Sequence, residues 1–229
     1  MVLPVLNTKR KELHLRSDVD ALLQHYNITI DWLIFIEDVM FLKDSPQLLN
    51  KVQVVLVDHN YPSEECMWLL SNVVKVIDHH EKLPHEIPMD KCNDWLIEKV
   101  GSCSSLVVEE MLRMPTRQRE DSSTSKENVQ ALDSTTPMNA SSSSLHSNSS
   151  DYKIDPTSAA LLIGAILVDT VCGSPAAARE TPKDADALNI LDATADLPYN
   201  QGRFFEWLMS AKFDISSRFI SKEMLSLIG

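Results

Sequence analysis

Short apolar runs alternate with amphipathic segments along the first 100 residues of the chain. This alternation is typical of an α/β protein with a parallel sheet and helices on both of its faces. Val52 to Val57 and Val73 to Ile77 are almost continuously apolar, which indicates parallel strands covered on both sides. Further strands are predicted over Val2 to Leu6 and Trp32 to Ile36, and a helix over Pro62 to Ser71.

Residues 114–153 differ in composition from the rest, because Ser, Thr, Asn and charged residues dominate them. Such a segment cannot bury enough apolar surface to offset its chain entropy. We interpret it as a disordered insert that, once phosphorylated, could dock protein partners. It separates residues 1–113 and 154–220, which we expect to form one α/β domain, and residues 221–229 would begin a linker or second domain.

The segment after the insert is mainly helical in pattern. An apolar core helix or strand ends at Val168 and is followed directly by Asp169. Helices are predicted over Pro182 to Ala193 and over Gln201 to Lys212. Thr181 is expected to cap the first of these, with proline at the first helical position.

Composition limits the classes of function. The chain has 229 residues, 44% of them hydrophobic, and a formal net charge of -12. No run of Lys and Arg is long enough to follow a nucleic-acid backbone, so a duplex is not an expected partner. A small polyanionic substrate remains compatible, because carboxylates that hold divalent cations count as negative charges in the total.

The sequence carries no signal for a membrane or for secretion. The longest apolar stretch, residues 159–168, is about half of the roughly 20 residues that cross a bilayer. The four cysteines lack CxxC spacing and are too sparse for a disulfide scaffold, which indicates a reducing, cytoplasmic compartment. They are Cys66, Cys92, Cys103 and Cys172.

Two similar polar clusters follow predicted strands. Asp58, His59 and Asn60 follow one strand, and the sequence Asp-His-His, which ends in His79 and His80, follows the next. The carboxyl ends of parallel strands line one ligand crevice, so the clusters are expected to form a single site. An isolated Asp-His pair at a strand end is usually a cap or turn, but two such pairs in one strand-helix-strand unit indicate function.

Aspartate and imidazole are ligands suited to Mn²⁺, Mg²⁺ or Co²⁺, and neither cluster contains a thiolate. Asp169, after the apolar segment, is a natural further ligand. Gly101 to Ser105 precede an amphipathic segment and could form a helix N-terminus that holds a phosphate. A plain N-cap explains this segment equally well.

These motifs resemble those of the DHH phosphoesterases. The segments Val-Asp-His-Asn at 57–60, Ile-Asp-His-His at 77–80 and Leu-Val-Asp-Thr around Asp169 are similar to three motifs of that family. The opening segment, the Gly-Ser-Cys-Ser-Ser element, Thr181 to Asp184 and Ala211 to Ser216 resemble the prune and exopolyphosphatase branch. The resemblance covers nearly the whole chain outside the Ser-rich insert.

The resemblance implies a hydrolase of phosphoanhydride bonds that uses a hydroxide activated by two metal ions, and it implies Mn²⁺ as the cofactor. It implies that Asp58 bridges two ions and that His79 and Asp169 bind one of them. His80 would face the phosphate as a catalytic group, and His59 and Ser102 would contact substrate. The implied substrates are pyrophosphate or short polyphosphate, with cyclic nucleotides as a further possibility.

Two departures from the family pattern leave an alternative open. The family has a first strand with a D-x-D motif and a carboxyl-terminal DHHA2 domain, and neither is recognised here. The chain could therefore be an inactive, truncated relative that acts as an interaction or regulatory module. A nucleotide-binding Rossmann domain is a weaker alternative, because no GxGxxG motif follows a strand.

Overall fold

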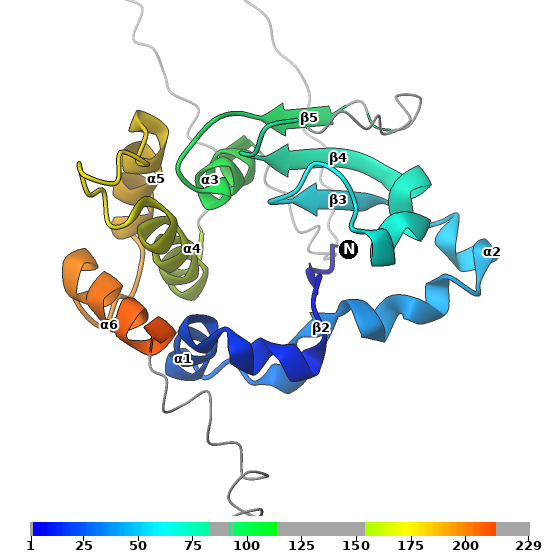
Figure 1. Cartoon of the computed structure of the whole chain (residues 1–229), viewed down its shortest axis with the longest axis horizontal. Helices are drawn as coiled ribbons and strands as arrows, with labels where there is room; N and C mark the ends of the chain where they lie inside the picture. The colour runs from blue at the N-terminus through cyan, green and yellow to red at the C-terminus, as the bar shows by residue number, and fades with distance from the viewer. Residues whose placement is uncertain (1, 83–91, 93, 114–153, 214–229) are drawn as a thin grey trace, which may run out of the picture.

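The computed structural model describes residues 2–82, 92, 94–113 and 154–213. Its strands form two parallel sheets (Figure 1). In the smaller, β1 (Val5–Leu6) pairs with β2 (Ile34–Phe35). In the larger, β4 (Val73–Asp78) lies between β3 (Val54–Val57) and β5 (Asp94–Ile97). The α/β class and the parallel pairing expected from the sequence are confirmed.

Helices of two kinds connect and cover these strands. The α-helices are α1 (Ser17–His25), α2 (Pro46–Leu49), α3 (Cys103–Arg113), α4 (Pro156–Thr170), α5 (Pro182–Asp192) and α6 (Gln201–Phe213). The 3-10 segments are η1 (Arg10–Leu15), η2 (Ile30–Trp32), η3 (Ile36–Leu42) and η4 (Glu64–Asn72).

The central strand β4 is covered on both faces, as its apolar run predicts. Ile77 packs in one buried cluster with Leu106 of α3. Val76, whose side chain points to the opposite face, packs with Leu56 of β3 and Leu70 of η4. Residues from helical segments therefore contact both faces of the sheet at β4. The prediction of two covered faces is wrong for β3, because Val55 and Val57 on one of its faces are 45% and 43% exposed.

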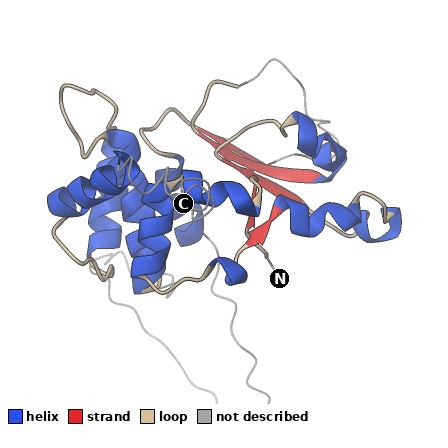
Figure 2. Ribbon diagram, turned by 60° about the horizontal axis from the view of Figure 1, so that its bottom comes forward, coloured by secondary structure: helices blue, strands red, loops and turns tan. Residues whose placement is uncertain are grey.

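A second core lies among the helices beside the sheet (Figure 2). Ile163 of α4, Leu191 of α5 and Phe204 of α6 are almost completely buried in it. Leu22 of α1 joins the same cluster, although α1 and α6 are far apart in the sequence. This helical core fixes the carboxyl end of α4, where Asp169 lies, relative to α3 and the sheet.

Helix ends follow the local signals in the sequence. The Asp155 side chain accepts a hydrogen bond from the Ser158 amide, and proline follows it at the first position of α4. The apolar segment that ends near Val168, for which the sequence allowed a helix or a strand, is therefore a helix. Thr181 caps α5 as predicted, and Asp184 closes the capping box by accepting from the Thr181 amide.

Several predicted elements are shorter or different in kind. The strand expected over Val2 to Leu6 is limited to Val5–Leu6. The strand expected over Trp32 to Ile36 is limited to Ile34–Phe35, because Trp32 and Ile36 belong to 3-10 segments on either side. The helix expected over Pro62 to Ser71 is a 3-10 segment. The predictions for residues 114–153 and 221–229 lie outside the described residues. Within the described part, no helix is long and apolar enough to cross a membrane.

Candidate metal centre

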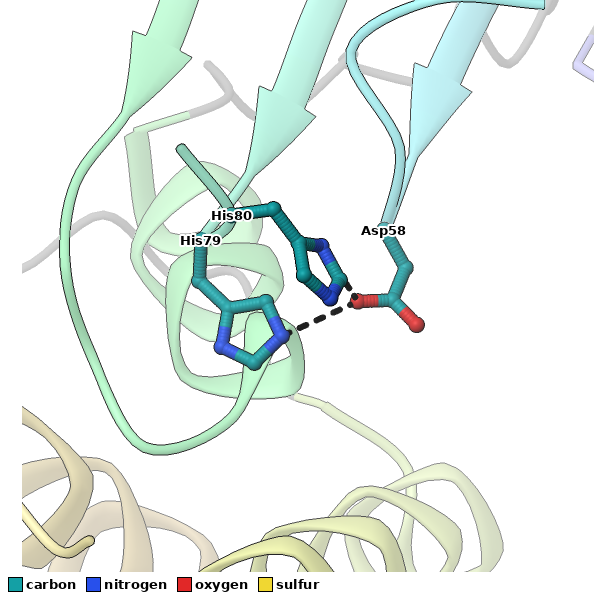
Figure 3. A group of neighbouring side chains, drawn as sticks. All are labelled: Asp58, His79 and His80. Carbon is teal, nitrogen blue, oxygen red and sulfur yellow. Dashed lines mark ion pairs between the residues drawn. The ribbon is translucent and has the colours of Figure 1, made fainter. Parts of the chain in front are cut away.

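The site forms where β3 and β4 end side by side. Val57 is in register with Ile77, and the Asp58 amide donates to the Ile77 carbonyl at 2.9 Å. Asp58 therefore lies beside the residues that follow β4. Figure 3 shows the carboxylate of Asp58 directed toward the rings of His79 and His80.

Asp58 has an unusual backbone conformation. Its φ of 65° lies in the left-handed region, which aspartate and asparagine tolerate better than most residues. This turn ends β3 and directs a carboxylate that is 62% exposed toward the imidazoles. Its Oδ1 lies 3.3 Å from His79 Nε2 and 4.0 Å from His80 Nδ1.

The tautomer of His79 follows from its hydrogen bond. Nδ1 lies 3.0 Å from the carbonyl oxygen of Val100, which can only accept, so Nδ1 carries the proton. When the ring carries only this proton, the lone pair of Nε2 is available to a metal ion on the side of Asp58. This is the arrangement of a metal-binding histidine held by a second residue.

The buried carboxylate of Asp78 orients the ring of His80. Its Oδ1 accepts from His80 Nδ1 at 2.8 Å, and its Oδ2 accepts from Asn60 Nδ2 at 2.7 Å. Burial alone would raise the pKa of Asp78, but hydrogen bonds from His80 and Asn60 hold that pKa below its usual value. The buried carboxylate therefore stays ionised and leaves the Nε2 of His80 free for a ligand.

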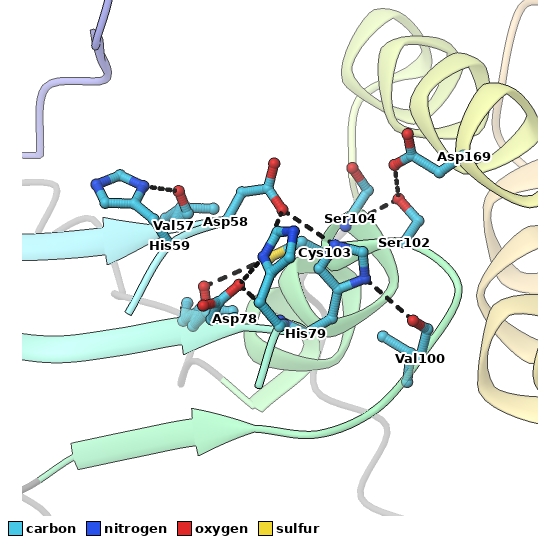
Figure 4. Close-up of polar contacts among 12 residues, drawn as sticks. Val57, Asp58, His59, Asp78, His79, Val100, Ser102, Cys103, Ser104 and Asp169 are labelled. Carbon is cyan, nitrogen blue, oxygen red and sulfur yellow. Dashed lines mark hydrogen bonds and ion pairs between the residues drawn. The ribbon is translucent and has the colours of Figure 1, made fainter. Parts of the chain in front are cut away.

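Asp169 approaches from the end of α4. Its Oδ2 accepts a hydrogen bond of 2.6 Å from the buried hydroxyl of Ser102 (Figure 4). Burial raises the pKa of Asp169, and the negative charge of Asp58 raises it further. A cation placed between these two carboxylates would relieve both effects.

The structure brings three of the six predicted site residues together in one group. The group whose potential ligand atoms lie within 4.8 Å of one another contains Asp58, His79 and His80, while Asp169 lies outside that group. His59 binds the Val57 carbonyl through Nδ1, and Figure 4 shows its ring directed away from the Asp58 carboxylate. A contact of His59 or Ser102 with substrate stays a prediction.

A nearby thiol does not belong to the donor set. Cys103 is buried at the start of α3, and its Sγ lies 3.4 Å from the Ile77 carbonyl. Burial, with smaller contributions from neighbouring carboxylates, raises the pKa of this thiol to about 12. Cys103 is not part of the group of potential ligands, whose donors are carboxylate oxygen and imidazole nitrogen. None of the four cysteines forms a disulfide.

Sequence reasoning overlooked the supporting contacts of Asn60, Val100 and Asp184. Asn60 could have been recognised from its position directly after Asp58 and His59. The capping-box pattern Thr-Pro-Lys-Asp marks Asp184 as a helix N-terminal residue but gives no sign of its contacts with the rest of the site.

These observations define the class of the protein. It is an α/β protein with a candidate metal centre at the carboxyl ends of its parallel strands. The chain is 31% identical over 214 residues to human exopolyphosphatase PRUNE1, across 93% of this chain and 38% of the human protein. It is 30% identical over 215 residues to the mouse protein of the same name, with the same coverage. These matches confirm the resemblance to the prune and exopolyphosphatase branch of the DHH phosphoesterases.

Two other comparisons were made. A protein of Methanococcus jannaschii named "putative family II inorganic pyrophosphatase" superposes with a TM-score of 0.49 and 18% identity, over 85% of this chain and 49% of that one. No family model matches the chain. The chain spans 38% of the length of the mammalian relatives it matches.

Proposed function

We propose that the protein is a metal-dependent hydrolase of phosphoanhydride bonds that acts on pyrophosphate or short polyphosphate with Mn²⁺. The observation that carries this proposal is the convergence of Asp58, His79 and His80 at the ends of β3 and β4. The sequence similarity to PRUNE1 exopolyphosphatases across 93% of the chain supports the choice of substrate class.

The donor set fits a divalent ion of the Mn²⁺, Mg²⁺ or Co²⁺ type. Oδ1 of Asp58 and Nε2 of His79 lie 3.3 Å apart. Carboxylate and imidazole donors suit these ions, and the group formed by Asp58, His79 and His80 contains no thiol. Asp169 would complete the set from α4.

Each residue has a distinct task in this proposal. Asp58 would bridge the ions, and His79 and Asp169 would hold one of them. His80, oriented by the buried Asp78, would present Nε2 to a phosphoryl oxygen where charge develops. When bound, divalent ions lower the pKa of a water molecule and neutralise phosphoryl oxygens, which is the chemistry that in-line phosphoryl transfer requires.

The test compares the chain with two aspartate variants. Phosphate release from pyrophosphate and tripolyphosphate would be measured with and without Mn²⁺ for the unmodified chain, Asp58→Asn and Asp44→Asn. Asparagine tolerates the positive φ of position 58, so this variant removes the charge and keeps the turn. Asp44 is exposed before α2 and serves as the matched control.

Replacing a residue that orients a metal ligand lowers metal affinity or activity about 10–100-fold, so losing a ligand itself should reduce the rate of phosphate release by more than about 100-fold. Asp44→Asn should keep the full rate. Turnover that persists in Asp58→Asn, or that does not require a divalent ion, would refute the proposal. If none of the three proteins releases phosphate, the chain acts as a binding module instead.

A further inference from the structure

Asp184 of α5 is completely buried and accepts five hydrogen bonds. The backbone amides of Gly101 and Ser102 donate at 2.8 and 3.1 Å, and the Ser105 hydroxyl donates at 2.7 Å. Thr181 supplies the other two, from its amide and its hydroxyl. The carboxylate therefore occupies the place of an anion at the N-terminus of α3.

The turn that Asp184 holds, residues 100–102, contacts two of the candidate metal ligands. The Val100 carbonyl accepts the Nδ1 proton of His79 at 3.0 Å. The Ser102 hydroxyl donates to Asp169 at 2.6 Å. One short turn thus orients a ligand that follows β4 and a ligand that ends α4.

Close packing leaves this turn little freedom to move toward α5. A Cβ atom at Gly101 would lie 2.8 Å from Asp184 Oδ2 and 2.7 Å from the Arg179 carbonyl oxygen. Real side chains do not approach so closely, so the absence of a side chain at this position lets Asp184 reach the amides.

Two salt bridges of Lys183 hold the N-terminal end of α5. Lys183 Nζ lies 2.5 Å from Glu98 Oε2, before the turn, and 2.7 Å from Glu109 Oε2, after it. The first turn of α5 is therefore attached to the chain on both sides of residues 100–102.

We propose that Asp184 is a positioning residue of the candidate metal centre, acting through the turn formed by residues 100–102. This inference rests on the proposed function for its metal, but its geometry is a property of the metal-free chain. Residues that hold metal ligands from outside typically contribute 10–100-fold to metal affinity. Removing the charge of Asp184 should loosen both His79 and Asp169 at once.

The experiment uses the whole chain and three variants of the first turns of α5. Asp184→Asn replaces the acceptor carboxylate by an amide of the same size. Asp186→Asn makes the same change at an exposed position two residues later. Ala187→Gly weakens the same helix at a buried position that makes no hydrogen bond with Asp184, and a glycine inside a helix lowers stability by about 1 kcal/mol relative to alanine.

Three quantities are measured: the Mn²⁺ dissociation constant by calorimetry, the melting temperature, and the ¹⁵N-detected tautomer of His79 without metal. Asp184→Asn should raise the dissociation constant at least about 10-fold and convert the single Nδ1–H tautomer to a mixture. Asp186→Asn and Ala187→Gly should leave both unchanged, although Ala187→Gly should lower the melting temperature.

An unchanged tautomer and dissociation constant in Asp184→Asn would overturn the inference. An equal loss of affinity in Ala187→Gly would also overturn it, because general destabilisation of α5 would then explain the effect. If the unmodified chain binds no Mn²⁺, the metal proposal fails and the His79 tautomer alone decides the positioning role. If Asp184→Asn does not fold, Gly101→Ala displaces the same turn and should alter the same tautomer signal.

Discussion

Asn60 is the hydrogen-bonded link between the two strand-end clusters, and its replacement by aspartate gives a specific test of the site. Its Nδ2 donates to Asp78 Oδ2 at 2.7 Å and to the Glu81 carbonyl at 3.0 Å. Both Asn60 and Asp78 are buried. Asn60→Asp keeps the size of the side chain but places a second carboxyl group against a buried carboxylate.

Two carboxylates at this distance do not both ionise, so the folded chain would hold one of them protonated. Keeping an aspartic acid of ordinary pKa, about 3.9, protonated at pH 7 costs about 4 kcal/mol, at about 1.36 kcal/mol per pH unit. The protonated group can donate to Asp78, which restores one hydrogen bond. We therefore expect the free energy of unfolding to fall by about 4 kcal/mol at pH 7 and by about 1.5 kcal/mol at pH 5.

The sign follows from proton linkage. The introduced carboxyl has a higher pKa in the folded than in the unfolded chain, so the folded state binds more protons. The stability of Asn60→Asp relative to the unmodified chain should therefore decrease as the pH rises from about 4 toward the raised folded pKa.

Urea denaturation at pH 5, 6 and 7 measures the difference directly. The matched control is Asn72→Asp, because Asn72 Nδ2 donates at 2.8 and 3.0 Å to the carbonyls of Leu49 and Val52 instead of a carboxylate. Its stability loss should depend less steeply on pH. A deficit in Asn60→Asp that is constant from pH 5 to pH 7, or a slope equal to that of the control, would refute the reasoning.

Two further predictions concern the thiol and the helical core. Because burial raises the pKa of Cys103 to about 12, only about one molecule in 10⁴ carries its thiolate at pH 8. Iodoacetamide should leave Cys103 unmodified in native protein and label it in urea, as mass spectrometry would show; labelling at equal rates would contradict the burial. Phe204→Ala removes a fully buried ring from the cluster with Ile163 and Leu208 and should lower the free energy of unfolding by about 3–5 kcal/mol in urea denaturation. A loss below about 1 kcal/mol would show that this core does not hold the helices together.

Strands with a continuous apolar run could be predicted from the sequence. Elements whose conformation depends on pairing or packing with other parts of the chain could not. β4 follows from its apolar run because it is packed from both sides. β3 has a similar apolar run, but only one of its faces is buried, since Val55 and Val57 are exposed. β5 begins with an aspartate and is only half-buried, so its strand conformation depends on pairing with β4 rather than on its own pattern. α1 carries a buried Asp18, which breaks the apolar stripe that would reveal a helix.

The site shows the same division. The approach of Asp58 to His79 follows from one rule, that parallel strands end at a common edge. The contact of Gly101 with Asp184 joins residues 83 positions apart, and no local pattern contains that information. The sequence therefore revealed candidate ligands but not the residues that hold them in place.

The contact between α1 and α6 sets an order of events during synthesis of the chain. The two helices lie side by side in Figure 1, and the Ser17 hydroxyl donates to the Ala211 carbonyl across 194 residues. At ribosomal rates of about 5–20 residues per second, α1 waits roughly 10–40 s for this partner. During that interval Leu22 has no α6 to cover it, so the nascent chain passes through a stage at which chaperones can bind its first helix.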